Sequence, residues 1–240
     1  MHKVIKLDNI RITYAGKAFG NMDYNYGSKK EVEKNHKKLI EIIESKYVAD
    51  IRSKSGNTFV DLDTEKLEKH INFFACDGLI TCNADIAFTL FPADCIPLVV
   101  YSLETNLKAL LHVGRRGAEA GLIENAIGYI STTKHEKIEN LRFYFGPSIS
   151  KDSYYFEKVD SNQLQSAEWK QYIENKNGHY YIDLIGFTGH RLEQMGVKPK
   201  HIKYSEINVA HSESNYFSHV QSTRNGEPEG RNLFAVESIN

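Results

Sequence analysis

Cysteine, proline and long apolar runs are scarce in this chain of 240 residues, and neither sign of charge is in excess. Three cysteines, an odd number, provide no disulfide framework, so we expect a reducing, cytoplasmic environment. No apolar stretch approaches the roughly 20 residues that cross a bilayer, and Met1–Lys6 does not resemble the start of a signal peptide. The 30 basic residues are balanced by 31 acidic ones, which argues against nucleic acid as a partner. We therefore expect a globular protein that binds neither membrane nor nucleic acid.

The remaining composition, 41% hydrophobic and 25% charged, is that of an ordinary globular protein. No repeat, low-complexity tract or linker divides the chain, so we expect a single domain over residues 1–240. Strand-like runs alternate with amphipathic segments, which predicts a mixed α/β (α+β) fold with largely antiparallel or mixed sheets. Ser28 and Glu31 form a capping box that starts the first helix. The other expected helices are 119–130, 161–174 and 184–195, and the expected strands are 3–7, 10–14, 58–62, 78–81, 86–91, 97–103, 107–113, 141–145, 180–183 and 201–204.

The most informative stretch is Phe91–Gly117, where two strand-like runs are joined by a short polar segment. This pattern predicts a β-hairpin. If the turn is centred near Glu104 and Thr105, residues whose numbers sum to about 209 face each other across an antiparallel ladder. Cys95 then falls within two residues of His112, and such diagonal neighbours lie roughly 5–8 Å apart at Cβ. The hairpin therefore brings a thiol and an imidazole close together.

The Cys95–His112 pair is open to three interpretations. A free cysteine and a histidine at a strand end are often plain buried groups. A thiolate at ~2.3 Å and an imidazole nitrogen at ~2.0–2.1 Å can share a zinc ion, although two ligands do not complete a site. A cysteine beside a histidine also suits nucleophilic catalysis, but the sequence shows no third residue that would orient the histidine.

The residues after His112 resemble an anion-binding corner. Gly114 and Gly117 flank Arg115 and Arg116 directly before an expected helix. Free backbone N–H groups and the positive end of the helix dipole attract anions at such a position. Together with Asp94, which precedes the cysteine, this makes one stretch of sequence the candidate active site. The candidate catalytic residues are Cys95, His112, Asp94 and Arg116.

Short strings along nearly the whole chain carry a family resemblance. In order they are EKNHKKL from Glu33, DGLIT from Asp77, ADCIP from Ala93, HVGRRG from His112, GPSI from Gly146, YID from Tyr181, YFS from Tyr216 and GR from Gly230. Their order and spacing resemble the laccase-domain family, also called multicopper polyphenol oxidoreductase-like and associated with purine nucleoside phosphorylase activity. The resemblance implies a layered α/β/β/α sandwich.

The resemblance also implies a zinc site with Cys95 and His112 as ligands. Ser55 stands where the family has its first ligand histidine, and a serine hydroxyl is a poor zinc ligand. Arg115 and Ser148 replace a family tryptophan and cysteine, which is a further departure. The residues to consider as substitutes for the missing ligand are His219 first, and then His70, Cys76 and Cys82.

The function that the resemblance implies is phosphorolysis of adenosine, with inosine or guanosine as other substrates and adenosine deamination as a related activity. The implied partners are a nucleoside and phosphate, and the oligomeric state stays open. Arg116 and Arg231 would hold the phosphate through bidentate hydrogen bonds, with Gly114 and Gly117 in the same anion-binding corner. Asp94 would orient a ligand or accept a proton.

Two other functions are weighed against this one. Ser55, Arg115 and Ser148 favour a family member that has lost catalysis and acts as a nucleotide-binding or interaction protein. A copper phenol oxidase needs many histidines, commonly in H-x-H pairs. The ten histidines of this chain include no such pair, which argues against copper.

Overall fold

The computed structural model describes residues 2–239, which form two six-stranded sheets, a smaller third sheet and six helices. The first sheet has the order β1 (Lys3–Leu7), β2 (Ile10–Ala15), β15 (Leu233–Ser238), β7 (Ile86–Leu90), β3 (Tyr47–Ile51), β5 (Ile71–Phe74). The second has the order β14 (Ile202–Tyr204), β10 (Leu141–Phe145), β8 (Ile96–Ser102), β9 (Lys108–Val113), β6 (Gly78–Thr81), β4 (Phe59–Asp61). The third has the order β11 (Tyr155–Phe156), β13 (His179–Ile182), β12 (Ile173–Lys176). The helices are α1 (Lys29–Ile42), α2 (Arg115–Glu119), α3 (Leu122–Thr132), α4 (Ser161–Gln165), α5 (Leu184–Gln194) and α6 (His219–Asn225).

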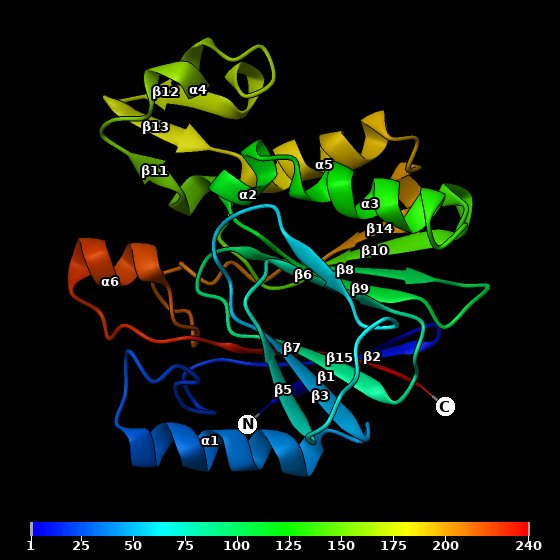
Figure 1. Cartoon of the computed structure of the whole chain (residues 1–240). Helices are drawn as coiled ribbons and strands as arrows, with labels where there is room; N and C mark the ends of the chain where they lie inside the picture. Colours follow the sequence, from blue (N-terminus) through cyan, green and yellow to red (C-terminus); the bar gives the residue numbers. More distant parts are fainter. Residues whose placement is uncertain (1, 240) are drawn as a thin grey trace.

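The two large sheets pack face to face, and helices cover their outer faces (Figure 1). Adjacent residues of β9 show this layering, because side chains alternate between the two faces of a strand. Leu110 joins Phe88 in the core between the sheets, whereas Leu111 joins Ile127 of α3 in the core beneath the helices. On the opposite side, Leu39 of α1 packs against the first sheet. The predicted mixed α/β layered sandwich is thereby confirmed. Within residues 2–239, no helix is long and apolar enough to cross a membrane.

Helix α1 holds the loop that precedes it. The Ser28 hydroxyl accepts a hydrogen bond from the backbone N–H of Glu31 at 3.3 Å, as the capping box predicts. Buried Asn35 donates to the carbonyl of Asn21 at 2.9 Å, and a ring nitrogen of His36 lies 2.8 Å from the carbonyl of Met22. The polar face of the helix therefore fixes residues 21–26, which form one wall of the cavity described below.

The structure differs from the expected helix at 161–174. Only Ser161–Gln165 is α-helical, and a turn of 3-10 helix at Lys170–Tyr172 leads into β12. Buried Trp169 stacks on Phe187 with ring centroids 3.8 Å apart, which fixes the turn. Asn177 and Gly178, both with positive φ, then close a hairpin that pairs β12 with β13. The stacking of Trp169 on Phe187 and the β12–β13 hairpin therefore outweigh the helical preference of residues 166–174.

A partly buried ion-pair network ties the residues that follow α3 to the second sheet. Lys134 Nζ lies 2.6 Å from the Asp61 carboxylate and 2.7 Å from that of Asp63. Asp63 also accepts hydrogen bonds from the Thr81 hydroxyl and from the backbone N–H of Cys82. Burial alone would raise the pKa of Asp63, but the hydrogen bonds from Lys134, Thr81 and Cys82 lower it to about 2. The carboxylate therefore stabilises the fold at pH above about 4, and this contribution is lost as the pH falls toward 2.

We expect Lys134→Met to lower the free energy of unfolding by about 0.5–1 kcal/mol at pH 7, because Asp63 is exposed and solvent screens its interaction with Lys134. Because protonation of Asp63 removes the same interaction, the difference between variant and parent should shrink as the pH falls toward 2. Urea unfolding at pH 7 and near pH 3 measures both values. Lys66→Met is the matched control, since Lys66 pairs with Glu68 at 3.8 Å and both side chains are exposed. A loss that does not depend on pH would contradict the assignment.

Candidate active site

A cavity of about 540 Å³ opens at the ends of the parallel strands β3 and β7, beside the β8–β9 hairpin. Its walls come from the loop at 23–26, from the segment that follows β3, from the segment between β7 and β8, and from two residues near the C-terminus. The lining residues are Asp23, Tyr24, Asn25, Tyr26, Ile51, Arg52, Ser53, Lys54, Ser55, Leu90, Phe91, Pro92, Ala93, Cys95, His112, His219 and Arg231. We call it the Cys95–His112 cavity.

The hairpin register brings Cys95 and His112 together at this cavity. Ile96 pairs with Val113 and Pro97 with His112, which is the register that the sequence predicts. A Cβ atom built on Gly114 would lie 2.9 Å from Cys95 Sγ and 3.8 Å from His112 Cε1. Glycine at this position therefore leaves room for the thiol and the imidazole on the same side of the hairpin.

A serine and an aspartate fix the His112 ring from behind. Ser53 Oγ lies 2.6 Å from His112 Nδ1 and donates to Asp77 Oδ1 at 2.7 Å. The same Asp77 oxygen lies 3.5 Å from His112 Nδ1. Asp77 is itself held by the backbone N–H groups of Lys54 at 3.0 Å and Gly56 at 2.9 Å. With Nδ1 engaged in this way, Nε2 is the ring nitrogen left for Cys95 or a substrate.

The electrostatics of the pair favour a charged imidazole. Burial opposes the charge of His112, but the charge of Cys95 and hydrogen bonds to Asp77 and Cys95 raise its pKa to about 9. Burial likewise opposes the charge of Asp77, but hydrogen bonds from His112, Ser53 and Gly56 lower its pKa to about 2. Asp77 is therefore a fixed negative charge behind a ring that can carry and deliver a proton.

Basic side chains give the cavity a positive wall. Arg52 stacks over the rings of Phe73 and Phe91, at 4.8 and 5.7 Å from their centroids, and pairs with Asp50 at 2.7 Å. Burial raises the pKa of Asp50 to about 7, although the charge of Arg52 opposes this shift. Asp50 therefore neutralises Arg52 only in part at neutral pH. Lys54, an exposed residue, adds a second basic side chain to the same wall.

Arg231, the third basic residue, is held at the cavity in a fixed position. It stacks on Tyr26 at 4.2 Å and donates to the tyrosine hydroxyl at 2.8 Å. It also pairs with Glu229 at 2.6 Å. Arg231, which the sequence suggests as an anion-binding residue, thus lines the cavity, and Glu229 and Tyr26 use part of its hydrogen-bonding capacity.

The other residues of the expected anion-binding corner lie around the cavity and not in it. Arg116 is exposed on α2 and does not line the cavity. Gly117 allows a close backbone approach, because a Cβ atom there would lie 2.7 Å from the carbonyl oxygen of Gly56. Helix α2 has only five residues, so its N-terminus is a weak anion site. The basic groups that line the cavity are therefore Arg231, which the sequence indicates, and Arg52 and Lys54, which it does not, whereas Arg116 lies outside it.

Asp94, the residue before Cys95 in the sequence, is buried and does not line the cavity. It has a positive φ of 79°, and its Oδ2 accepts a hydrogen bond from the backbone N–H of Val220 at 2.7 Å. Burial raises the pKa of this carboxyl group, while hydrogen bonds from Ser218 and Val220 oppose that rise. Asp94 thus joins the loop that carries Cys95 to the start of α6, which is a positioning role.

The resemblance implies a zinc ion, which would need at least one more protein ligand beside Cys95 and His112. Ser55 is exposed, with a φ of 55°, and its backbone N–H donates to Ser53 Oγ at 3.1 Å. His219 lines the cavity, but its Nδ1 lies 3.2 Å from the Glu229 carboxylate. Over residues 2–239, no group of three or more His, Cys, Asp or Glu side chains is arranged to hold a metal. Because zinc sites use at least three protein ligands, the donors present do not fit a resident zinc ion.

The remaining substitute ligands lie outside the wall of the Cys95–His112 cavity. His70 binds the carbonyl of Lys46 through Nδ1 at 2.6 Å. Cys76 is buried, and burial raises the pKa of its thiol to about 11. Cys82 is exposed beside Asp63. None of these side chains adds a donor to Cys95 and His112.

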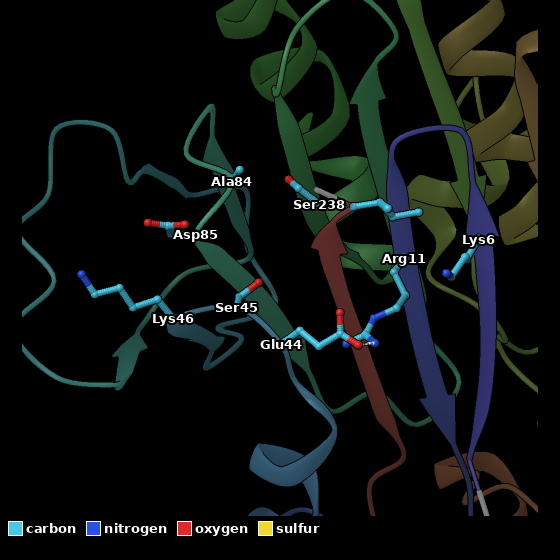
Figure 2. Close-up of a pocket in the computed structure, with 9 residues that line it drawn as sticks. Lys6, Arg11, Glu44, Ser45, Lys46, Ala84, Asp85 and Ser238 are labelled. Carbon is cyan, nitrogen blue, oxygen red and sulfur yellow. Dashed lines mark hydrogen bonds and ion pairs between the residues drawn. The ribbon is translucent and has the colours of Figure 1, made fainter.

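A second cavity of about 380 Å³ lies at the other end of β7, where Ala84 and Asp85 precede the strand. Figure 2 shows Arg11 and Glu44 pointing toward each other across it. Arg11 also pairs with buried Glu237. Arg11 is thus paired with two carboxylates, and neither a cysteine nor a histidine lines this second cavity, so the Cys95–His112 cavity is the better candidate for an active site.

The sequence motifs do not indicate four of the residues at this site, which are Arg52, Ser53, Lys54 and Asp77. Asp77 lies directly before a strand and 35 positions before His112, and nothing local indicates that their side chains meet. In the structure the two residues are joined through the backbone, because the N–H of His112 donates a hydrogen bond to the carbonyl of Asp77 at 2.7 Å. The sequence feature that indicates this partner is an acidic residue, Asp77, directly before β6, the strand that pairs with β9.

The fold and this cavity define a class of layered α/β proteins with a thiol and an imidazole on one β-hairpin at the edge of a basic cavity. Residues 15–237 match the family model described as multi-copper polyphenol oxidoreductase laccase, so the chain belongs to that family. This finding confirms the family resemblance that the sequence motifs indicate.

Curated relatives and solved structures extend the match. The chain is 26% identical over 232 residues to a purine nucleoside phosphorylase of Rickettsia conorii, covering 92% of both chains. It is 29% identical over 153 residues to the purine nucleoside phosphorylase YlmD of Geobacillus stearothermophilus, covering 60% of this chain and 54% of that protein. The crystal structure of that YlmD matches with a TM-score of 0.79 and 22% identity, covering 96% of this chain and 92% of that one. The hypothetical protein YfiH of Bacillus licheniformis matches with a TM-score of 0.79 and 17% identity, covering 100% and 99%. These two structures show a shared fold.

Proposed function

We propose that this chain is a purine nucleoside phosphorylase with its active site in the Cys95–His112 cavity. The observation that carries the proposal is that one cavity joins a fixed imidazole, three basic side chains and aromatic rings. The names of the relatives support the same activity. Adenosine is the substrate to test first, with inosine and guanosine next, and deamination of adenosine is the competing reaction to measure beside phosphorolysis.

Phosphorolysis needs an anion site and a proton donor at opposite ends of the bond that breaks. A phosphate oxygen forms a bond to C1′ of the ribose while the C1′–N9 bond breaks and its electron pair leaves with the purine. The departing base then takes up a proton. Groups that stabilise the phosphate and supply this proton lower the barrier.

The basic wall of the cavity provides the anion site. Arg52, Lys54 and Arg231 hold and orient the phosphate, and Lys54 belongs to the segment that also binds Asp77. The positive charge of this wall attracts phosphate before the nucleoside reacts. The arginines are restrained by Asp50 and Glu229, so they act as oriented donors at the edge of the phosphate.

The imidazole and an aromatic ring of the cavity wall serve the purine. His112 Nε2 delivers a proton to the departing base, and Ser53 and Asp77 hold the ring in position from the other side. Tyr24, which is an exposed aromatic residue of the cavity wall, offers flat apolar surface on which a purine can stack. No step in this scheme requires a metal ion, in agreement with the donor set.

Lys54→Met is expected to raise KM for phosphate by about 10- to 100-fold, the range that corresponds to loss of one charge-assisted hydrogen bond. The KM for adenosine should change little, because Lys54 contacts the anion and not the base. Initial rates measured over a range of phosphate concentrations check this split. Lys46→Met, which removes a lysine from the wall of the second cavity, is the matched control. Equal changes in both KM values would contradict the assignment of Lys54.

The activity itself is tested with the unmodified chain, adenosine and phosphate. Formation of adenine and ribose 1-phosphate that depends on phosphate supports the proposal. Formation of inosine without dependence on phosphate would replace it by deamination. Binding of adenosine in calorimetry without any product would favour the alternative that the family fold survives here as a nucleotide-binding protein.

A further inference from the structure

The groups around Cys95 are ordered as in enzymes that use a cysteine nucleophile. The thiol and the imidazole both face Gly114, since a Cβ atom there would lie 2.9 Å from Cys95 Sγ and 3.8 Å from His112 Cε1, and the ring is oriented through Nδ1 by Ser53 and Asp77. Such enzymes place a nucleophile next to a base and a third group behind the base to orient it. The sequence alone does not show a third residue that would orient His112, and in the structure Asp77 takes this position.

A carboxylate behind a histidine also occurs at metal sites, where it orients the ligand ring. A zinc site needs at least three protein donors, whereas a nucleophilic cysteine needs only the histidine and the group that orients the histidine. Cys95 and His112 lack a third protein donor over residues 2–239, and the exposed Ser55 replaces the histidine that the family resemblance leads one to expect. The oriented ring is therefore better matched to the neighbouring thiol than to a metal.

Access to the thiol is the second requirement, and the cavity meets it. Cys95 is partly exposed and lines the cavity, whereas His112 is 8% exposed and shielded from solvent. Arg52 and Lys54 belong to the same wall, so a small anionic reagent is drawn toward the sulfur. A thiol at a positively charged, partly open position beside a histidine is the setting of reactive cysteines.

We propose that Cys95 is a nucleophilic thiol that reacts with small carbon electrophiles, with His112 as its base and with Ser53 and Asp77 as positioning residues. In the reaction with iodoacetamide, a C–S bond forms, the C–I bond breaks and iodide leaves. The proton of the thiol ends on His112 Nε2. This inference stands on the geometry of the four residues and does not depend on turnover of a nucleoside.

The test measures the alkylation rate of each cysteine in the full chain, purified without a metal-affinity tag. Iodoacetamide is the probe, and peptide mapping by mass spectrometry follows Cys95 and Cys82 in the same sample. Cys82 is the more exposed thiol, but burial of its sulfur and the charge of Asp63 raise its pKa to about 11, so the decisive comparison is Cys95 in the parent against Cys95 in the Ser53 variants. We expect Cys95 to react at least about 10-fold faster than Cys82.

The Ser53 variants show whether the hydrogen-bonded ring is responsible. Ser53→Ala should slow alkylation of Cys95 by about 10-fold and leave Cys82 unchanged, which also reports that the chain remains folded. Ser53→Thr keeps the hydroxyl and should restore the rate at Cys95. A structural role for Ser53 alone would change both cysteines, or would not distinguish alanine from threonine. Iodoacetate, the anionic reagent, should lose more rate than iodoacetamide in Lys54→Met.

Two outcomes would overturn the inference. One is a Cys95 rate no higher than that of Cys82. The other is near-stoichiometric zinc in the purified chain, with Cys95 becoming reactive only after a chelator removes the metal. The inference predicts far less than one zinc ion per chain and no effect of the chelator on alkylation.

Discussion

Replacing His112 by glutamine is expected to lower kcat for adenosine phosphorolysis by about 100-fold or more, the usual contribution of a general acid. Adenine is a poor leaving group until it is protonated, and glutamine can donate a hydrogen bond but cannot transfer a proton. Because the basic wall is unchanged, KM for phosphate should stay within about threefold of the parent value. Steady-state rates with both substrates varied give kcat and the two KM values separately.

A nucleoside that needs no proton distinguishes this role from a structural one. In 7-methylguanosine the purine is already cationic and leaves as a neutral base. The His112→Gln variant should therefore lose much less activity with 7-methylguanosine than with adenosine. His201→Gln is the control, because His201 is 8% exposed, as His112 is, and precedes β14 away from the cavity. Equal losses on both nucleosides would show that the substitution disturbs the fold and not proton transfer.

The parts of the site that the sequence predicts are those that local structure determines. The hairpin turn sets the register of β8 against β9, and the register sets the proximity of Cys95 and His112. Only the five residues 103–107 separate the two strands, so alternation and turn chemistry suffice. The capping box of α1 is predicted for the same reason, because Ser28 and Glu31 lie three residues apart.

The rest of the site depends on pairing between distant segments. Asp77 reaches His112 because β6 pairs with β9, and Ser53 reaches both because the segment after β3 folds back over the start of β6. Gly117 contributes by admitting the backbone of Gly56 at close range. No periodicity in the sequence encodes these approaches, so the groups that orient His112 become visible only in the fold.

Strand β15 carries a buried ion pair between Arg11 and Glu237, at the end of the first sheet that lies away from the Cys95–His112 cavity. The Glu237 side chain is 3% exposed, and its Oε2 accepts a hydrogen bond from Arg11 Nε at 3.1 Å. Its other oxygen accepts from the backbone N–H groups of Glu44 and Ser45, each at 2.8 Å. Arg11 also donates to the carbonyl of Ile42 at 2.9 Å. One carboxylate thus joins β15 to β2 and to the end of α1.

Glu237→Ala is expected to lower the free energy of unfolding by about 2–3 kcal/mol, because it leaves two backbone N–H groups without their acceptor and leaves Arg11 with the exposed Glu44 as its remaining carboxylate partner. Phosphorolysis by the folded protein should be retained, since the Cys95–His112 cavity lies at the other end of β7. Urea unfolding followed by tryptophan fluorescence measures the loss. The double variant Arg11→Met with Glu237→Leu should recover part of it, because replacing both charges by apolar groups removes the cation that has lost its buried partner. A loss below about 1 kcal/mol for Glu237→Ala would mean that water satisfies these groups, and the network would then contribute nothing to the junction of helix and sheet.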